Sequence, residues 1–349
     1  MASSWRSKGR RAQHQGPVGA PPSPPELAPP SFWSSPAARQ WPWDPNHFPP
    51  SVALMSTTTA APAPARAAGT LQAAAAMTLL GCSTGVTATF SSYPVAAGQA
   101  LRYAIAAAVL LPLARRQKKL FTRLTVRDAA LLLALAATGL FAFNLLMITA
   151  LRHTDPAVVG SIVGCTPLLL GVLGPLLARR RPAVRLLVAA GLVVVGAALT
   201  QGFGSGDAVG LVCAAGTLLC EAAFSLLAVP LLPRLGPVRV SAYTTALAVP
   251  MFAVTAAVGP TPLRLPTLAE LLALLFLSLL MTCVAFLLWY SALSRLAPEH
   301  AGLFGGLIPL TATLSGAVLT STAPTPLQLV GATLVTAALV LGPGRTDPA

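Results

Sequence analysis

Ten apolar segments, each long enough to cross a bilayer as a helix, follow one another along this chain and limit what it can fold into. A water-soluble domain could not cover them, because hydrophobic residues make up 55% of the chain and charged residues only 9%. Inside lipid every backbone N–H and C=O has to be bonded, and the alternation typical of barrel strands is absent. We therefore predict an all-α integral membrane protein with ten transmembrane helices. The predicted helices are residues 70–90, 93–113, 129–150, 156–178, 184–201, 208–230, 238–258, 268–291, 299–319 and 325–342.

Residues 1–68 are of a different kind, rich in Pro and Ala and without an apolar run long enough to insert into a membrane. We expect this segment to be a disordered cytoplasmic tail. Met55 offers an alternative true start, in which case the residues before it are a gene-model artefact.

Basic residues gather in every second joint between the predicted helices. The joint after the second helix holds six of them and the joint after the fourth holds four, whereas joints on the other side hold only Arg152 and Arg264. Such clusters mark the cytoplasmic side of a membrane protein. We expect a multi-pass protein of the plasma (inner) membrane with both termini cytoplasmic. The net charge of +14 then reflects orientation, and no nucleic-acid partner is expected.

The chain also contains an internal repeat. The stretch ALRHTDPAVVGSIVGCTP at residues 150–167 returns without a gap as ALSRLAPEHAGLFGGLIP at residues 292–309, 142 positions later. About 2 identities would arise by chance, and six are found. We predict two five-helix repeats, 69–201 and 206–343. Because each repeat holds an odd number of helices, equivalent helices run in opposite directions. The repeats are therefore inverted, which is typical of secondary transporters.

Several of these residues match a known pattern. The match has three parts. The first is Arg102 and Tyr103 in the second helix. The second runs from Asn144 through the pair Ala150 and Leu151 to Pro167, and the third runs from the pair Ala292 and Leu293 to Pro309. The chain from Gly69 to Pro343 resembles the EamA-type permeases of the drug/metabolite transporter (DMT) superfamily. The resemblance implies two EamA repeats and a permease that exports or exchanges amino acids and small metabolites. It also implies a central cavity lined mainly by helices 1, 3, 4, 6, 8 and 9. Glu221 departs from the pattern, since a tryptophan often stands at its position.

Two ionisable residues, Glu221 and Arg102, lie well inside predicted helices. Burying either one alone costs roughly 2.5 to 3.5 kcal/mol, so each should face the protein interior and find a partner. We hypothesise that Glu221 faces the cavity and binds either a proton or the amine of a substrate. A structural ion pair between the two, or Arg102 bonded to backbone carbonyls, is the alternative.

Other polar side chains lie at similar depth. Asn144, Thr166 and Thr282 are further candidates for substrate or proton binding, although each alone is more often a bond between helices. Near the end of the eighth helix, Trp289 and Tyr290 are expected to anchor the protein at the interface, with cavity lining as the alternative.

Small residues and prolines recur in the fourth and ninth helices. The glycines should let helices approach closely, and the prolines should free backbone carbonyls and act as hinges. These hinge and packing residues are Gly160, Gly164, Pro167, Gly302, Gly306 and Pro309.

No metal, cofactor or enzymatic activity is expected. The pairs His153/Asp155 and Glu299/His300 fall on opposite sides of the predicted membrane and cannot form one metal site, so interfacial solvation is the better explanation. No convergent catalytic set and no nucleotide-binding loop is recognised.

The expected function is a secondary active transporter, an exporter of a small organic metabolite such as an amino acid, working by alternating access. An exchanger of sugar phosphates or nucleotide sugars is an alternative, but it would need several cavity cations rather than Arg102 alone. A membrane scaffold or sensor is another. The expected partners are a small-molecule substrate and the lipid bilayer, and a homodimer is left open.

Overall fold

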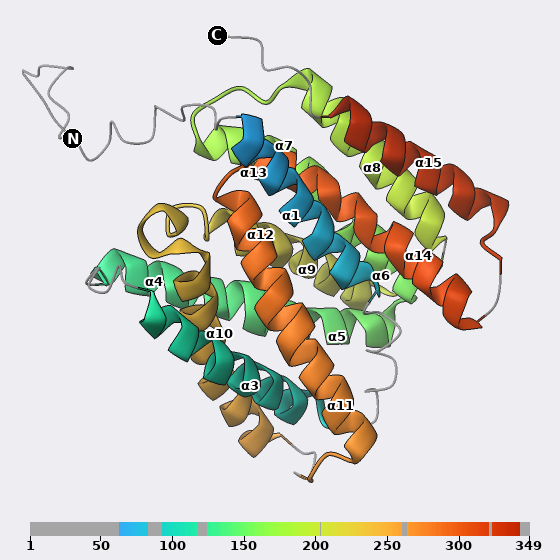
Figure 1. The fold of residues 1–349 in the computed structure, drawn as a ribbon. Helices are drawn as coiled ribbons and strands as arrows, with labels where there is room; N and C mark the ends of the chain where they lie inside the picture. Colours follow the sequence, from blue (N-terminus) through green and yellow to red (C-terminus); the bar gives the residue numbers. More distant parts are fainter. Residues whose placement is uncertain are drawn as a thin grey trace, which may run out of the picture. The chain divides into compact units, whose positions relative to one another are not determined.

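Helices and the joints between them account for all the described residues. The structure is a computed structural model that describes residues 63–82, 93–117, 124–202, 204–259, 264–320 and 323–342. The α-helices are α1 (Ala63–Cys82), α3 (Val95–Arg116), α4 (Val126–Leu135), α5 (Phe143–His153), α6 (Pro156–Val163), α7 (Thr166–Leu177), α8 (Val184–Gln201), α9 (Ala208–Leu226), α10 (Leu232–Val258), α11 (Leu268–Phe276), α12 (Ala285–Leu293), α13 (Pro298–Gly302), α14 (Leu307–Thr320) and α15 (Pro326–Leu341) (Figure 1). Two π-helical segments, η2 (Ala136–Ala142) and η3 (Leu277–Val284), and one 3₁₀ segment, η4 (Leu303–Gly306), join some of them.

In the described part of the chain these elements form ten continuous rods, because α4–η2–α5, α6–α7, α11–η3–α12 and α13–η4–α14 each make one. The predicted all-α fold with ten helices is confirmed. Seven rods are long and apolar enough to cross a membrane by length and composition, and α15 is a shorter apolar helix. Of the remaining two, α1 carries Arg66 and α13–η4–α14 is interrupted.

The first helix begins earlier than predicted. Residues 63–68 belong to α1, so the prediction of disorder up to residue 68 is wrong for these six. Alanine dominates this stretch and has the highest helix propensity, which explains the extension. Residues 1–62, including Met55, and residues 83–92 lie outside the described part.

The repeat is visible in local structure as well as in sequence. Thr125 caps α4 by accepting from the backbone N–H of Asp128 at 3.2 Å, and the Asp128 carboxylate accepts from the Thr125 N–H at 2.9 Å. Thr267 and Glu270 make the same reciprocal pair at the start of α11, at 3.3 and 2.8 Å. Each capping box satisfies N–H groups that the helix leaves free. Each of these rods also turns π-helical at its middle, η2 in one and η3 in the other.

Hydrogen bonds between helix ends show that equivalent helices run antiparallel. At the end of α3 the Gln117 carbonyl accepts from Arg239 near the start of α10, at 3.3 Å. Just before α3 begins, the Tyr93 hydroxyl donates to the Arg264 carbonyl beyond the end of α10, at 2.9 Å. Since α3 and α10 are the second helices of their repeats, the two repeats are inverted.

The last helices of the repeats, α8 and α15, pack along one another in the same antiparallel way (Figure 1). Arg185 at the start of α8 donates to the Leu341 carbonyl at the end of α15, at 2.8 Å. Gln328 near the start of α15 donates to the Thr200 carbonyl near the end of α8, at 3.5 Å. Equivalent rods thus lie against each other at two places in the bundle.

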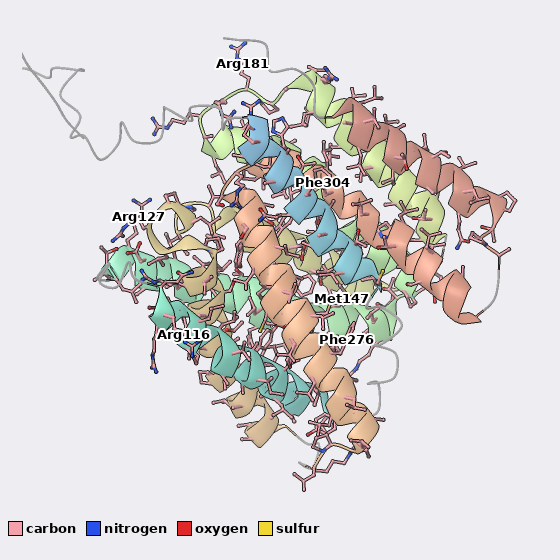
Figure 2. The ribbon with its side chains drawn as sticks, viewed as in Figure 1. Arg116, Arg127, Met147, Arg181, Phe276 and Phe304 are labelled. Atoms are coloured by element: carbon pink, nitrogen blue, oxygen red, sulfur yellow. The ribbon has the colours of Figure 1, made fainter. Side chains whose placement is uncertain are left out.

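One end of the bundle is rich in arginine, and we call it the basic end. It is where α3 and α7 end and where α4, α8 and α10 begin. Arg116 and Arg127 lie at such helix ends, and Arg181 lies in the joint between α7 and α8, all on the periphery (Figure 2). The opposite end is where α3, α6, α9, α11 and α15 begin.

Candidate functional site

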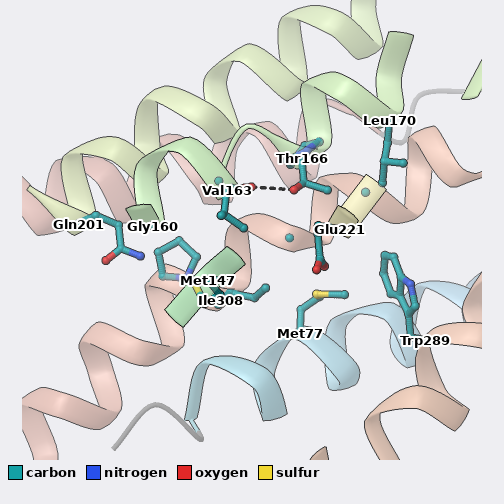
Figure 3. A pocket seen from close by; sticks show the side chains of 15 residues that line it. Met77, Met147, Gly160, Val163, Thr166, Leu170, Gln201, Glu221, Trp289 and Ile308 are labelled. Atoms are coloured by element: carbon teal, nitrogen blue, oxygen red, sulfur yellow. Dashed lines mark hydrogen bonds between the residues drawn. The ribbon is translucent and has the colours of Figure 1, made fainter. Parts of the chain in front are cut away.

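Two adjoining hollows among the helices form one cavity. Lobe A, of ≈ 170 Å³, reaches from Gly160 and Gln201 toward Leu170 (Figure 3), and Gly302 also lines it. Lobe B, of ≈ 140 Å³, lies among α1, α3, η2, α5, α9, η3 and α12. Three side chains line both lobes and mark their junction: Met77, Glu221 and Trp289.

Glu221 projects from α9 into this junction. Figure 3 shows its carboxylate pointing into lobe A, with Thr166 and Leu170 on one side and Met77 and Trp289 on the other. Among the described residues no hydrogen-bond donor or cation contacts it. A carboxylate left open in a mostly apolar cavity is available to a proton or to a cationic ligand.

Arg102 lines lobe B but does not pair with Glu221 in this structure. Its Nε donates to the Thr282 hydroxyl at 2.8 Å, and its guanidinium lies 5.5 Å from the centre of the Tyr103 ring. The Thr282 hydroxyl also donates to the Leu277 carbonyl, five residues earlier, at 3.1 Å, a reach that the π-helical turn of η3 provides. Two of the sequence candidates are therefore brought together.

Asn144 lines lobe B through a second set of bonds. Its carbonyl oxygen accepts from Gln99 at 2.9 Å, and its amide nitrogen donates to the Tyr103 hydroxyl at 3.1 Å and to the Leu140 carbonyl at 2.6 Å. Tyr103 thus connects Asn144 to the guanidinium of Arg102. Nothing in the sequence had singled out Gln99, which lies one helical turn before Tyr103.

Thr166 lines lobe A, but its hydroxyl is bonded to the Val163 carbonyl at 2.7 Å. That carbonyl lies at the break between α6 and α7, just before Pro167. Pro309 follows the 3₁₀ segment η4 in the equivalent rod. Both prolines line lobe A, and both rods lose regular α-helical geometry just before them.

The four repeat glycines divide into two groups. Gly160, Gly164 and Gly302 line lobe A, whereas Gly306 packs against α8 and α15. A Cβ on Gly306 would lie 2.7 Å from Val193 Cγ1, too close without a shift of the neighbour.

Trp289 and Tyr290 do not anchor the protein at an interface, so that expectation is wrong. Trp289 is 5% exposed, lines both lobes and donates its indole N–H to the Ser225 hydroxyl at 3.3 Å. Tyr290 is fully buried and its ring lies 5.1 Å from that of Phe224. Position near a helix end suggested the interface, but α1 and α10 pack on α12, and Ser225 of α9 contacts Trp289.

Sequence reasoning also missed the apolar walls of the cavity. Their side chains resemble any other helix-packing residue in sequence, and the only available signal was helical spacing, such as the step of three positions from Glu221 to Phe224. The missed lining residues include Met77, Met147, Phe143, Phe224 and Phe286.

The two suspected metal pairs serve other purposes, and no group of three possible ligands occurs within the described ranges. At the opposite end His153 contacts Asp207 at 2.8 Å, and Asp155 accepts from the Ser205 N–H at 2.8 Å. The backbone N–H of Gly210, followed by the contact with His153, lowers the pKa of Asp207. These bonds join the joint after α5 to the joint before α9.

Glu299 is not an interfacial residue, because its side chain is only 3% exposed. It pairs with Arg180 at 2.9 Å across α7 and α13 at the basic end. The prediction of interfacial solvation is therefore wrong for Glu299.

Two inverted helical repeats that enclose one partly polar cavity within a bilayer-spanning bundle define a membrane transporter. The chain belongs to the EamA-like transporter family, whose pattern matches residues 67–201 and 208–341, one match for each repeat. This places it in the DMT superfamily, among transporters and not enzymes.

Individual proteins agree with this assignment. The uncharacterized transporter YetK of Bacillus subtilis (strain 168) is 30% identical over 259 residues, which cover 70% of this chain and 78% of that protein. A solved crystal structure that is 20% identical superposes with a TM-score of 0.69 over 79% of this chain and 97% of that one, and it shows the same fold.

Proposed function

We propose that this transporter is a secondary active exporter of a small zwitterionic metabolite, such as an amino acid, and that it works by alternating access. The observation that carries the proposal is the Glu221 carboxylate, which faces both lobes of the cavity and has no partner among the described residues. A substrate ammonium or a proton would neutralise it. Competition between the two at one carboxylate would couple export to proton entry.

Arg102 supports a substrate that also carries a negative group. Its Nε is held by Thr282, and no carboxylate neutralises it within the described residues. A guanidinium in a poorly solvated cavity favours an anionic ligand. Together, Glu221 and Arg102 offer one site of each sign, which suits a zwitterion.

The same charges argue against the main alternative. A sugar-phosphate or nucleotide-sugar exchanger has to neutralise a multiply charged anion, and Arg102 is the one basic residue among those that line either lobe in the described part. A scaffold or sensor has no need for the cavity. We further propose that the protein lies in the plasma membrane with its basic end on the cytoplasmic side, because an excess of arginine favours that side.

The test is to compare the metabolites released by cells that lack the protein, overproduce it, or overproduce Glu221→Gln. Export should rise on overproduction and be lost in Glu221→Gln, because an amide can neither be protonated nor neutralise an ammonium. Leu219→Ala on the same helix is the control, since Leu219 is 60% exposed on the outer surface of the bundle and should leave export unchanged. Full export by Glu221→Gln, made in normal amounts, would refute the role of Glu221.

A further inference from the structure

At the basic end of lobe A, α7 packs against α13, and we call this contact the closure. The two helices pack closely there, and Leu170 contacts Gly302. A Cβ added to this glycine would lie 2.9 Å from Leu170 Cδ1. One turn further, a Cβ on Gly174 would lie 2.9 Å from the Glu299 carboxylate. Small residues on both helices therefore permit the closure.

An ion pair lies on the solvent side of this closure, at the basic end. The Glu299 side chain is 3% exposed and the Arg180 side chain 54%, with 2.9 Å between Oε1 and Nη2. The second Glu299 oxygen, Oε2, is buried and has no hydrogen-bond partner among the described residues. Arg180 is the cation that contacts this carboxylate in the described part, and moving α7 away from α13 would break the contact.

At the opposite end the same two rods are held apart. There α6 packs on α8 and α9, whereas α14 packs on α1 and α8, and no comparable packing joins α6 to α14 in the described part. Gly160, the repeat equivalent of Gly302, lies next to Gln201 of α8 instead of next to Ala312, the equivalent of Leu170. The inverted repeat therefore shows one closed and one unclosed copy of the same contact.

The sequence shows that the other repeat has no equivalent of this ion pair. The positions equivalent to Arg180 and Glu299, again 142 residues away, are Thr322 and Ala157, which cannot form an ion pair. The capping boxes differ in this respect. Asp128 and Glu270 are equivalent residues of the two repeats, and each of them contacts an arginine. The contact of α7 with α13 therefore has an ion pair that the equivalent residues of the other repeat cannot form.

We propose that Arg180 and Glu299 form a latch at the basic end with no counterpart at the opposite end, so that the resting transporter keeps its cavity closed toward the cytoplasm. The inference rests on the proposed function, because it assumes that the closure opens and shuts during transport. Opening α7 from α13 would expose Glu299 and separate it from Arg180. The external closure, formed by Gly160 and Ala312, would then hold without an ion pair and be the weaker of the two.

The latch can be tested with a cysteine reporter in the full chain. The reporter is Gly305→Cys, which lines lobe A and has room for a side chain, since the nearest atom to its Cβ would be Pro167 Cγ at 3.6 Å. The native cysteines are replaced by alanine: Cys82, Cys165, Cys213, Cys220 and Cys283. A membrane-impermeant maleimide is then applied from either face, in right-side-out and inside-out vesicles.

We expect the reporter to react mainly from the external face while the latch is intact. Glu299→Gln and Arg180→Gln should each raise its rate from the cytoplasmic face by about tenfold, the effect expected when a bond to a charged group is lost. Arg181→Gln is the matched control, an exposed arginine next to the pair, and should change neither rate. Arg180→Gln alters the exposed partner and so tests the latch even if Glu299→Gln does not fold.

An unchanged cytoplasmic rate in either folded variant would overturn the latch, and so would fast cytoplasmic labelling while the pair is intact. The labelling needs no substrate, so the two proposals fail separately. Unchanged labelling in a protein that still exports would remove the latch alone. Shifted labelling in a protein that exports nothing would remove the proposed function alone.

Discussion

At the scale of single residues, the two charged side chains of the cavity differ in how firmly their neighbours hold them. Glu221 is open to both lobes, whereas Arg102 is fixed by the Thr282 hydroxyl and by the face of the Tyr103 ring. Fixing a guanidinium in advance reduces the ordering cost of binding an anionic group. The Thr282 hydroxyl is therefore expected to act on substrate affinity through Arg102 and not by direct contact.

Thr282→Val tests this positioning role. Removing the hydroxyl takes away a hydrogen bond to a charged group, so the KM of export should rise by about tenfold while the protein stays folded. Ser278→Ala, in the same π-helical segment, is the control, because among the described residues the Ser278 hydroxyl donates only to the Leu274 carbonyl. Equal effects of the two changes on KM would show that the hydroxyl serves the helix and not Arg102.

Residue identity in the sequence was enough to select Glu221, Arg102 and Thr282, because ionisable and polar groups are costly in a membrane helix unless they serve a purpose. It could not show which of them share a contact. The bond from Arg102 to Thr282 joins residues 180 positions apart, and it depends on how α3 meets η3.

At the scale of elements, glycines set how closely equivalent helices approach. The α8 and α15 backbones nearly touch, since a Cβ on Gly196 would lie 2.7 Å from the Gly331 carbonyl oxygen. Neither backbone can yield without separating the helices. In a membrane such close approach replaces the hydrophobic effect as the source of helix association.

Gly196→Ala should therefore lower stability, by about 1 to 3 kcal/mol, because the added methyl group overpacks a backbone contact. Gly191→Ala is a matched control on the same helix, where a Cβ would meet no atom of the described residues within 4 Å. That change should be neutral or stabilise by up to about 1 kcal/mol, since alanine is the better helix former. Thermal unfolding in detergent measures both, and equal melting temperatures would contradict the packing role of Gly196.

The sequence predicted most helices to within a few residues, since apolar length and basic joints mark where each one enters and leaves the membrane. It predicted distortion near Pro167 and Pro309, because proline removes a donor from the helix. The π-helical segments η2 and η3 contain no Pro, and Gly139 occurs in η2 alone, so the sequence did not predict them. The start of α1 was missed because an alanine-rich helix with Arg66 resembles a polar tail in composition.

At the scale of the whole molecule, duplication explains why one small cavity can serve both faces of the membrane. The two repeats meet through α3 with α10 and through α8 with α15, and the junction of the lobes lies among helices of both. Inverted copies of one unit can close at either end with nearly the same contacts. Differences between the copies, such as the pair of Arg180 with Glu299, then decide which closure is favoured.

The central claim, that the repeats are inverted across the membrane, is tested most directly by an epitope inserted at equivalent joints of the full chain. The sites are after Leu120, between α3 and α4, and after Pro262, between α10 and α11. We predict that antibody reaches the Pro262 epitope in intact cells and the Leu120 epitope only after permeabilisation. Two epitopes exposed on the same face would contradict the account.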